Sequence, residues 1–290
     1  MTAITVIAIL AAAATIYGFV AMDSCERVKV APKGKKKKYQ VQEVPETGIL
    51  FMVIMAVALI VRYIAAAKYF GNETDMNCFI AWGDMIFKDG IGNFYSSDSF
   101  TDYPPGYMYI LYMVGAIRHV LGVAWNSTLS VMLTKTPAII ADLATAYLLF
   151  RIAGKRWTQK GAGILTAIYL FAPAVLLDGA IWGQTDAVFT FFVVLMIYLV
   201  TERKLIPSYF VFAVAVLVKP QSLIFTPVLI YGIIDQVFLD GFDWKNFWKN
   251  LGLGLAAIAM IALLMLPFGF KDALSQYTET LASYKFASVN

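Results

Sequence analysis

Runs of apolar residues long enough to cross a bilayer constrain this chain most. A helix needs about 20 residues to cross roughly 30 Å of hydrocarbon, and Gly48 to Ala67 and Val131 to Phe150 are such runs. The composition agrees, because 60% of the residues are hydrophobic and only 14% are charged, which one soluble core of this size could not accommodate. Backbone polar groups in lipid must be satisfied internally, so the sequence predicts an all-α, polytopic bundle of transmembrane helices.

The N-terminal segment, residues 1–47, is expected to form one helix and a lysine-rich loop. In Ile4 to Met22 the positive charges follow the apolar run, which favours a retained helix over a cleaved secretory signal. Lys33 to Lys38 supplies much of the net charge of +4, and it suits a cytoplasmic anchor near anionic lipids better than a nucleic-acid surface. We expect residues 48–290 to form one transmembrane domain, the lipid bilayer to be a partner and nucleic acid not to be one.

Basic residues set the expected orientation of the helices. They gather in three loops that the positive-inside rule places in the cytoplasm: residues 27–38, 151–160 and 203–204. The helix of Gly48 to Ala67 then runs outward, and residues 72–103, which follow it, lie on the outer side.

Two apolar runs follow this outer segment, but the orientation allows only one of them to cross. About Met108 to Val123 comes after a Pro-Pro-Gly sequence and contains Arg118 and His119, so we expect it to lie along or partly within the outer interface. Val131 to Phe150 is then the crossing helix. The sequence therefore predicts interfacial helices in the first large external loop.

The second half of the chain is expected to cross several more times. Ile164 to Leu177 runs outward, the chain turns over Leu177 to Asp186, and Val188 to Val200 returns. In Ile206 to Ile233 the sequence Lys219-Pro220-Gln221 interrupts the run, because proline lacks a backbone donor. We favour a two-helix hairpin with Lys219 near its outer bend over a single crossing. A last crossing follows over Leu251 to Leu266.

Under this orientation, carboxylate, amide and lysine side chains gather toward the outer leaflet. The residues are Asp75, Asp102, Lys135, Asp178, Gln184, Asp186 and Lys219. Such groups in or beside membrane helices are costly unless they are paired or face a water-filled cavity, so they are functional candidates. The alternative is a set of structural ion pairs.

Asp75 begins a segment whose aromatic and aliphatic residues recur at helical spacing. These residues, which we expect to face the lipid interface, are Phe79, Trp82, Ile86 and Phe87. With Thr74 as a possible N-cap, Asp75 would be held in the first turn of a helix and kept ionised by its dipole. It could then act as a base, although capping alone would also explain it. Lys135 could hold an anionic head group, or it could extend to the interface as an ordinary anchoring lysine.

Two further motifs combine polar groups with helix interruptions. Trp182, Gln184 and Asp186 offer an aromatic face, an amide and a carboxylate, a mixture typical of sugar contacts; the alternative is a turn with a helix cap. Lys219 and Gln221 could hold a phosphate, or could satisfy carbonyls freed by the proline break. The single histidine has no partner at ligand spacing, so we expect no metal site.

Five stretches follow one another in an order that resembles the GT-C superfamily of membrane glycosyltransferases, and most of all its bacterial mannosyltransferase-like members. They are Asp75, then DYPPGY (102–107), KTPAIIADL (135–143), PAVLLDGAIWGQTDA (173–187) and VLVKPQSLIFTP (216–227). The resemblance extends from about Gly48 to Ile233. Such enzymes usually continue for several more helices, so the resemblance also implies that the chain is incomplete at its C-terminus.

The resemblance implies an inverting transfer of a sugar, such as mannose, from a polyprenyl-phosphate-sugar donor. The acceptor would be a lipid, glycan or protein on the outer face of a bacterial plasma membrane, and no cofactor is implied. Asp75 would be the general base, and Lys135 and Lys219 would bind the donor phosphate. The residues expected to contact substrate are Asp102, Tyr103, Trp182, Gln184, Asp186 and Gln221. The alternative is a transporter or flippase of lipid-linked sugars.

Overall fold

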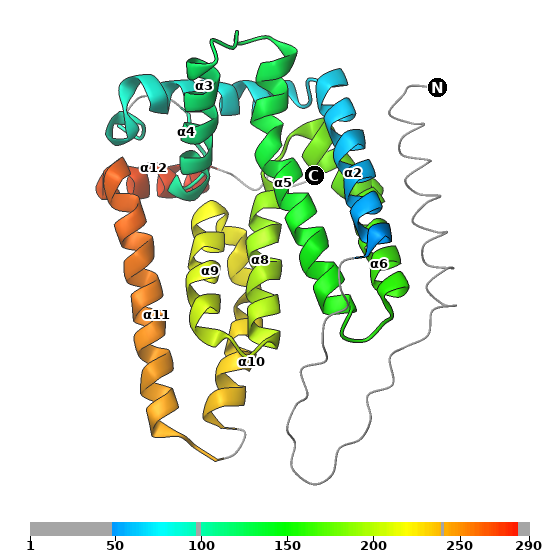
Figure 1. Ribbon diagram of the computed structural model, residues 1–290. Helices are drawn as coiled ribbons and strands as arrows, with labels where there is room; N and C mark the ends of the chain where they lie inside the picture. The colour runs from blue at the N-terminus through cyan, green and yellow to red at the C-terminus, as the bar shows by residue number, and fades with distance from the viewer. Residues whose placement is uncertain (1–47, 97–99, 239–240, 284–290) are drawn as a thin grey trace, which may run out of the picture. The chain divides into compact units, whose positions relative to one another are not determined.

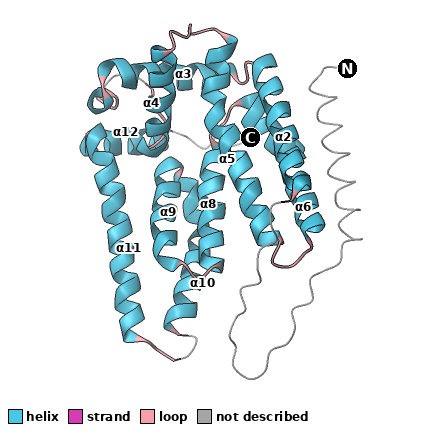
Figure 2. Cartoon of the chain, in the orientation of Figure 1, coloured by secondary structure: helices cyan, strands magenta, loops and turns pink. Residues whose placement is uncertain are grey.

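The computed structural model describes residues 48–96, 100–238 and 241–283, and every regular element among them is a helix (Figures 1 and 2). This confirms the all-α prediction. The helix and lysine-rich loop expected in residues 1–47 lie outside the described residues. The described residues form two compact units: one contains those up to Gly71 and Ala138–Ala187, and the other contains those of Asn72–Pro137 and those from Val188 onward.

The first unit is built around α2, whose small residues allow close packing. Its elements are α2 (Ile49–Lys68), the larger part of α5 (Thr128–Ala153), α6 (Gln159–Phe171), α7 (Pro173–Leu176) and the π-helical η2 (Leu177–Trp182). α2 packs against α6 and η2. Ala58, Ala146 and Leu170 are fully buried in one cluster, and the rings of Phe51 and Phe150 lie 4.4 Å apart.

The turn predicted over Leu177 to Asp186 is helical in its first six residues, Leu177–Trp182. The chain bends by 52° between α6 and the segment that starts at Pro173, because proline cannot donate the next helical hydrogen bond. Helical structure then continues through η2. The chain leaves it at Gly183, whose φ of +90° is left-handed and suits glycine.

The second unit contains the remaining helices. Its complete elements are α3 (Glu73–Asp89), η1 (Ile91–Asn93), α4 (Pro105–Val120), α9 (Leu205–Val218), η3 (Pro220–Phe225), α10 (Thr226–Val237), α11 (Trp244–Met265), η4 (Leu266–Phe268) and α12 (Phe270–Ser283). It also contains the start of α5 and nearly all of α8 (Asp186–Thr201). α3 and α4 pack closely because a glycine of each helix, Gly83 and Gly115, meets the other.

The proline break predicted in the run from Ile206 to Ile233 is confirmed, and so is the hairpin. α9 ends before Lys219, η3 makes the bend, and α10 returns along α9. A Cβ atom at Gly232 would lie 2.9 Å from Leu205 Cδ1, so the end of α10 lies against the beginning of α9. Lys219 therefore lies at the bend, as expected.

Three described helices are long and apolar enough to span a bilayer: α2, α5 and α11 with η4. α6 with the segment up to Trp182 makes a fourth if the bent pair is one span, and α8 and α9 are apolar but shorter. α4 has only 16 residues, and its interfacial position stays a prediction. The chain is a multi-pass membrane protein.

α3 forms where the sequence predicted it, but its cap and its apolar face differ from expectation. The N-cap is Asn72, not Thr74, and the Asn72 side chain accepts a hydrogen bond from the backbone of Asp75. Phe79, Trp82 and Ile86 do not face lipid, because they are at most 4% exposed in the packing between α3 and its neighbours. Phe87 is the exposed member of this set.

Candidate functional site

Asp75 and Asp102 lie near the same thiol in the second unit. The backbone N–H of Asp75 donates to Asn72 Oδ1 at 3.1 Å, which fixes the carboxylate in the first turn of α3. One turn further on, burial raises the pKa of the Cys78 thiol, and the negative charges of Asp102 and Asp75 raise it further. The structure therefore brings both predicted carboxylates close to Cys78.

Aromatic packing holds Tyr103 beside these carboxylates. Its ring centroid lies 5.8 Å from that of Phe79, 6.0 Å from that of Trp82 and 5.9 Å from that of Tyr107. The Tyr95 hydroxyl donates to the carbonyl oxygen of Tyr103 at 2.8 Å. Burial raises the pKa of Tyr95, so this phenol remains a neutral donor near neutral pH. The segment before α4 is thus anchored by rings from α3 and α4.

Lys219 approaches the same aromatic rings from the break between α9 and η3. Its Nζ lies 5.4 Å from the ring centroid of Phe189 and 6.0 Å from that of Tyr103, both within the range of cation–π attraction. The Ser222 hydroxyl donates to the carbonyl of Ala215 at 2.9 Å, so a carbonyl near the break is satisfied by serine. We call Lys219, Tyr103, Phe189, Phe79 and Trp82 the lysine–aromatic cluster.

The other predicted site residues are in different surroundings. Lys135 is completely buried in α5, which disagrees with a side chain reaching the interface. Gln221 is exposed in η3. Trp182, Gln184 and Asp186 belong to the first unit, where Trp182 ends η2 and is 47% exposed, and Asp186 begins α8.

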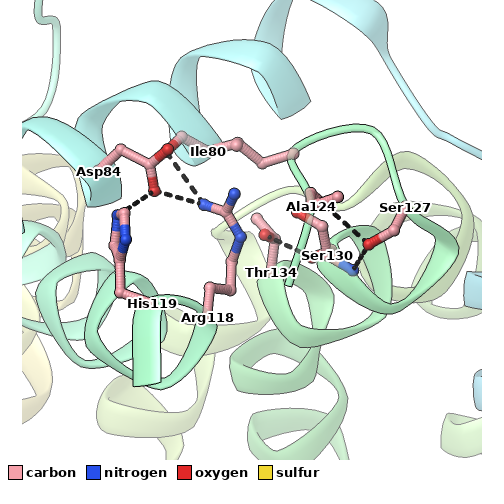
Figure 3. Close-up of polar contacts among 8 residues, drawn as sticks. All are labelled: Ile80, Asp84, Arg118, His119, Ala124, Ser127, Ser130 and Thr134. Atoms are coloured by element: carbon pink, nitrogen blue, oxygen red, sulfur yellow. Dashed lines mark hydrogen bonds and ion pairs between the residues drawn. The ribbon is translucent and has the colours of Figure 1, made fainter. Parts of the chain in front are cut away.

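The sequence analysis missed an ionic cluster between α3 and α4 (Figure 3). Arg118 Nη1 donates to Asp84 Oδ1 at 2.8 Å, and His119 Nε2 lies 3.3 Å from the same oxygen. The His119 ring stacks on Phe87 with centroids 4.7 Å apart. The signal available in the sequence was an aspartate on one predicted helix, Asp84, and an arginine next to a histidine, Arg118 and His119, on the following apolar run. Within the described residues, no group of three or more His, Cys, Asp or Glu could hold a metal ion.

A second missed pair lies inside the first unit. Arg62 of α2 donates from Nε to Asp142 Oδ2 of α5 at 3.1 Å and from Nη2 to the Leu170 carbonyl at 2.9 Å. The Tyr169 hydroxyl donates to the other Asp142 oxygen at 3.3 Å. Both charged side chains are nearly fully buried. One charge in each of two apolar runs was the signal that could have revealed this pair.

A comparison with protein families decides how the chain is classified. The family described as "GPI transamidase subunit PIG-U" matches residues 83–287, which is more than two-thirds of the chain. The chain belongs to the PIG-U family. No curated protein matches it.

This family membership corrects the predicted activity. The expectation of a glycosyltransferase is wrong, since the matched family is a subunit of a GPI transamidase. The relation to the GT-C superfamily and the polyprenyl-phosphate-sugar donor are not supported by the match, and the expected bacterial plasma membrane stays a prediction. Three of the five stretches, DYPPGY, PAVLLDGAIWGQTDA and VLVKPQSLIFTP, contain helix breaks or loops, whereas KTPAIIADL lies inside α5 and Asp75 inside α3. Such motifs describe a helical framework and do not by themselves specify a reaction.

Proposed function

We propose that this PIG-U family member binds the head group of a lipid-linked glycan and presents it within a GPI transamidase. The observation that carries the proposal is the position of the lysine–aromatic cluster in a chain of this family. Lys219, Tyr103 and Phe189 all lie within the matched residues 83–287, whereas Asp75 precedes them. The substrate class follows from the family description, because GPI is a glycosylated phosphatidylinositol.

The chemistry of the cluster suits such a head group. An ammonium group attracts a phosphate, and aromatic faces pack against the apolar faces of sugar rings. Asp102 and Asp75, which lie near Cys78, offer acceptors for sugar hydroxyls or an ammonium group. The basic loops favour an extracytoplasmic position for these residues. We assign Asp75 a binding role instead of the role of base.

Most of the remaining predicted residues contribute separately to this proposal. Gln221 is a candidate hydrogen-bonding group beside Lys219, whereas the completely buried side chain of Lys135 is not accessible to a phosphate in this structure. In the first unit, the exposed Trp182 with Gln184 and Asp186 is a candidate sugar-contacting turn. Their substitution should weaken glycolipid binding without changing the helical fold.

The test replaces the lysine of the cluster in cells that lack their own PIG-U family subunit. Lys219→Met should lower both glycolipid retained on the purified complex and surface display of a GPI-anchored reporter. Lys249→Met is the matched control, because Lys249 is an exposed lysine of α11. The remaining subunits should co-purify with both variants.

Three results would decide against the proposal. Normal glycolipid retention by Lys219→Met would remove the cluster from binding. Loss of the other subunits with this variant alone would make Lys219 an assembly residue. Movement of glycolipid across vesicle membranes by the purified chain would support the alternative of a flippase.

A further inference from the structure

A small pocket lies where α8 ends and α9 begins, against the last turns of α10, all in the second unit. Its volume is about 150 Å³. It is lined by Val200, Arg203, Leu205, Tyr231, Gly232, Asp235 and Gln236. The pocket has room for a small polar head group but not for a glycan of several sugars.

Arg203 at the edge of this pocket has an unusual backbone. Its φ is +58°, and no other non-glycine residue among those described has a positive φ. The Lys204 N–H donates to the Leu199 carbonyl at 2.8 Å and the Arg203 N–H to the Val200 carbonyl at 3.0 Å. This is the Schellman pattern at a helix C-terminus, and the position of Arg203 in it is usually glycine. An arginine in left-handed backbone points to a role for its side chain.

The Arg203 side chain forms an ion pair across the pocket. Its Nη2 lies 3.3 Å from Asp235 Oδ2, with side chains 54% and 22% exposed, respectively. An ion pair this exposed contributes little to stability, so stability alone is a weak reason to place arginine here. The neighbouring charged residues on the same turn are Glu202 and Lys204. The pocket therefore presents one positive and one negative group side by side.

The surroundings of the pocket combine a close-packed floor with an apolar flank. A Cβ atom at Gly232 would lie 2.9 Å from Leu205 Cδ1 and 3.1 Å from Val200 Cγ1, so the absence of a side chain at Gly232 lets α10 pack closely against these two residues. On α10, Ile230 and Ile234 are about half exposed and Tyr231 is 68% exposed. Ile234 lies four positions after Ile230 and three after Tyr231, so both of these residues are its neighbours on the helix surface and the three form one apolar strip. A lipid chain could lie along this strip beside the polar pocket.

We propose that this pocket binds the head group of a zwitterionic phospholipid of the phosphatidylethanolamine type. The phosphate contacts the Arg203 guanidinium, which suits phosphate through its fork of donors. The ammonium contacts the Asp235 carboxylate, and the acyl chains lie along Ile230 and Ile234. The paired charges favour a zwitterion, which brings an ammonium for Asp235 when its phosphate takes Arg203, over an anionic lipid such as phosphatidylglycerol, which brings no cation.

This lipid site is separate from the lysine–aromatic cluster. α9 has 14 residues, which corresponds to about 21 Å at 1.5 Å per residue. Arg203 precedes this helix, and Lys219 follows it. The basic residues at 203–204 favour the cytoplasmic leaflet for the new site. If phosphatidylethanolamine does not bind at the Arg203 pocket, the proposal of a glycolipid site at the lysine–aromatic cluster is unaffected.

The test measures binding of short-chain phosphatidylethanolamine and phosphatidylglycerol to the purified full chain in detergent. Wild type should bind the first lipid more tightly. Arg203→Gly removes the guanidinium and supplies the residue that the backbone prefers, so the variant should retain its thermal stability while its affinity for phosphatidylethanolamine falls about tenfold or more. Asp235→Asn should lose the preference for phosphatidylethanolamine and bind the two lipids about equally.

Lys204→Gln is the matched control, because it removes an adjacent exposed positive charge, and it should bind phosphatidylethanolamine as wild type does. Unchanged binding by Arg203→Gly would overturn the site, as would equal binding of the two lipids by wild type. A fall in thermal stability of Arg203→Gly with unchanged lipid binding would show that Arg203 has only a structural role.

Discussion

Replacing Arg62 by methionine should destabilise the first unit strongly. Arg62 is fully buried, and its guanidinium serves both Asp142 and the backbone carbonyl of Leu170. Leu170 lies in the last turn of α6, where carbonyls have no helical donor, and lipid offers none. Arg62→Met therefore leaves a carboxylate without its cation and a carbonyl without its donor.

The magnitude follows from these two losses. Removing one partner of a buried ion pair costs about 3–5 kcal/mol. At roughly 2–4 °C per kcal/mol, a value for soluble domains of 150–250 residues, this corresponds to a fall in Tm of about 6–20 °C. In the double variant Arg62→Met/Asp142→Leu no charge remains unpaired, so the fall in Tm should be smaller than in either single variant.

The measurement is thermal unfolding of the full chain in one detergent at one protein concentration. Lys68→Met is the control, because Lys68 is an exposed lysine at the end of the same helix. It should change Tm little. If the effects of Arg62→Met and Asp142→Leu add in the double variant, the two side chains do not form a coupled buried pair and the reasoning is refuted.

Two further predictions concern the second unit. Gly115→Ala should disrupt the packing of α4 on α3, because the new Cβ atom would collide with the backbone of Gly83. Gly252→Ala should be tolerated, because no atom lies within 4 Å of its Cβ position. Thermal unfolding in detergent checks both variants, and equal stability of the two would contradict the close approach of α3 and α4. Cys78 should react slowly with a maleimide in a Cys25→Ser background, because burial and then Asp102 raise its thiol pKa. Asp102→Asn should lower that pKa and speed labelling at pH 7–8, since more thiolate is present; an unchanged rate would contradict the electrostatic effect of Asp102.

The sequence predicted the helices whose boundaries depend on local properties. The apolar runs of α2 and α5 and the break at Lys219 follow from residue hydrophobicity and from the missing N–H of proline. The periodicity of α3 also identified a helix and its apolar face. It could not show what covers that face, so Phe79 and Trp82 were assigned to lipid when they are buried.

Contacts between distant segments lay beyond sequence reasoning. Arg62 and Asp142 are 80 residues apart, and nothing local pairs them. The cluster around Asp84 likewise required α3 and α4 to be placed side by side. The sequence did identify Lys219 and Tyr103 as candidates, and the structure brings them together. The reaction was predicted wrongly, because short motifs of a helical membrane protein describe a framework that different functions can use.

Photocross-linking from the lysine–aromatic cluster tests the central claim most directly. A photoreactive phenylalanine at Phe189, whose ring lies 5.4 Å from Lys219 Nζ, would be compared with one at Phe242, which is 45% exposed between α10 and α11. The account predicts a cross-linked product at Phe189 whose mass contains a glycan phosphate lipid, and much less of it at Phe242 or in the presence of Lys219→Met. Cross-linking at Phe189 to ordinary phospholipids alone, or equally at both positions, would contradict it.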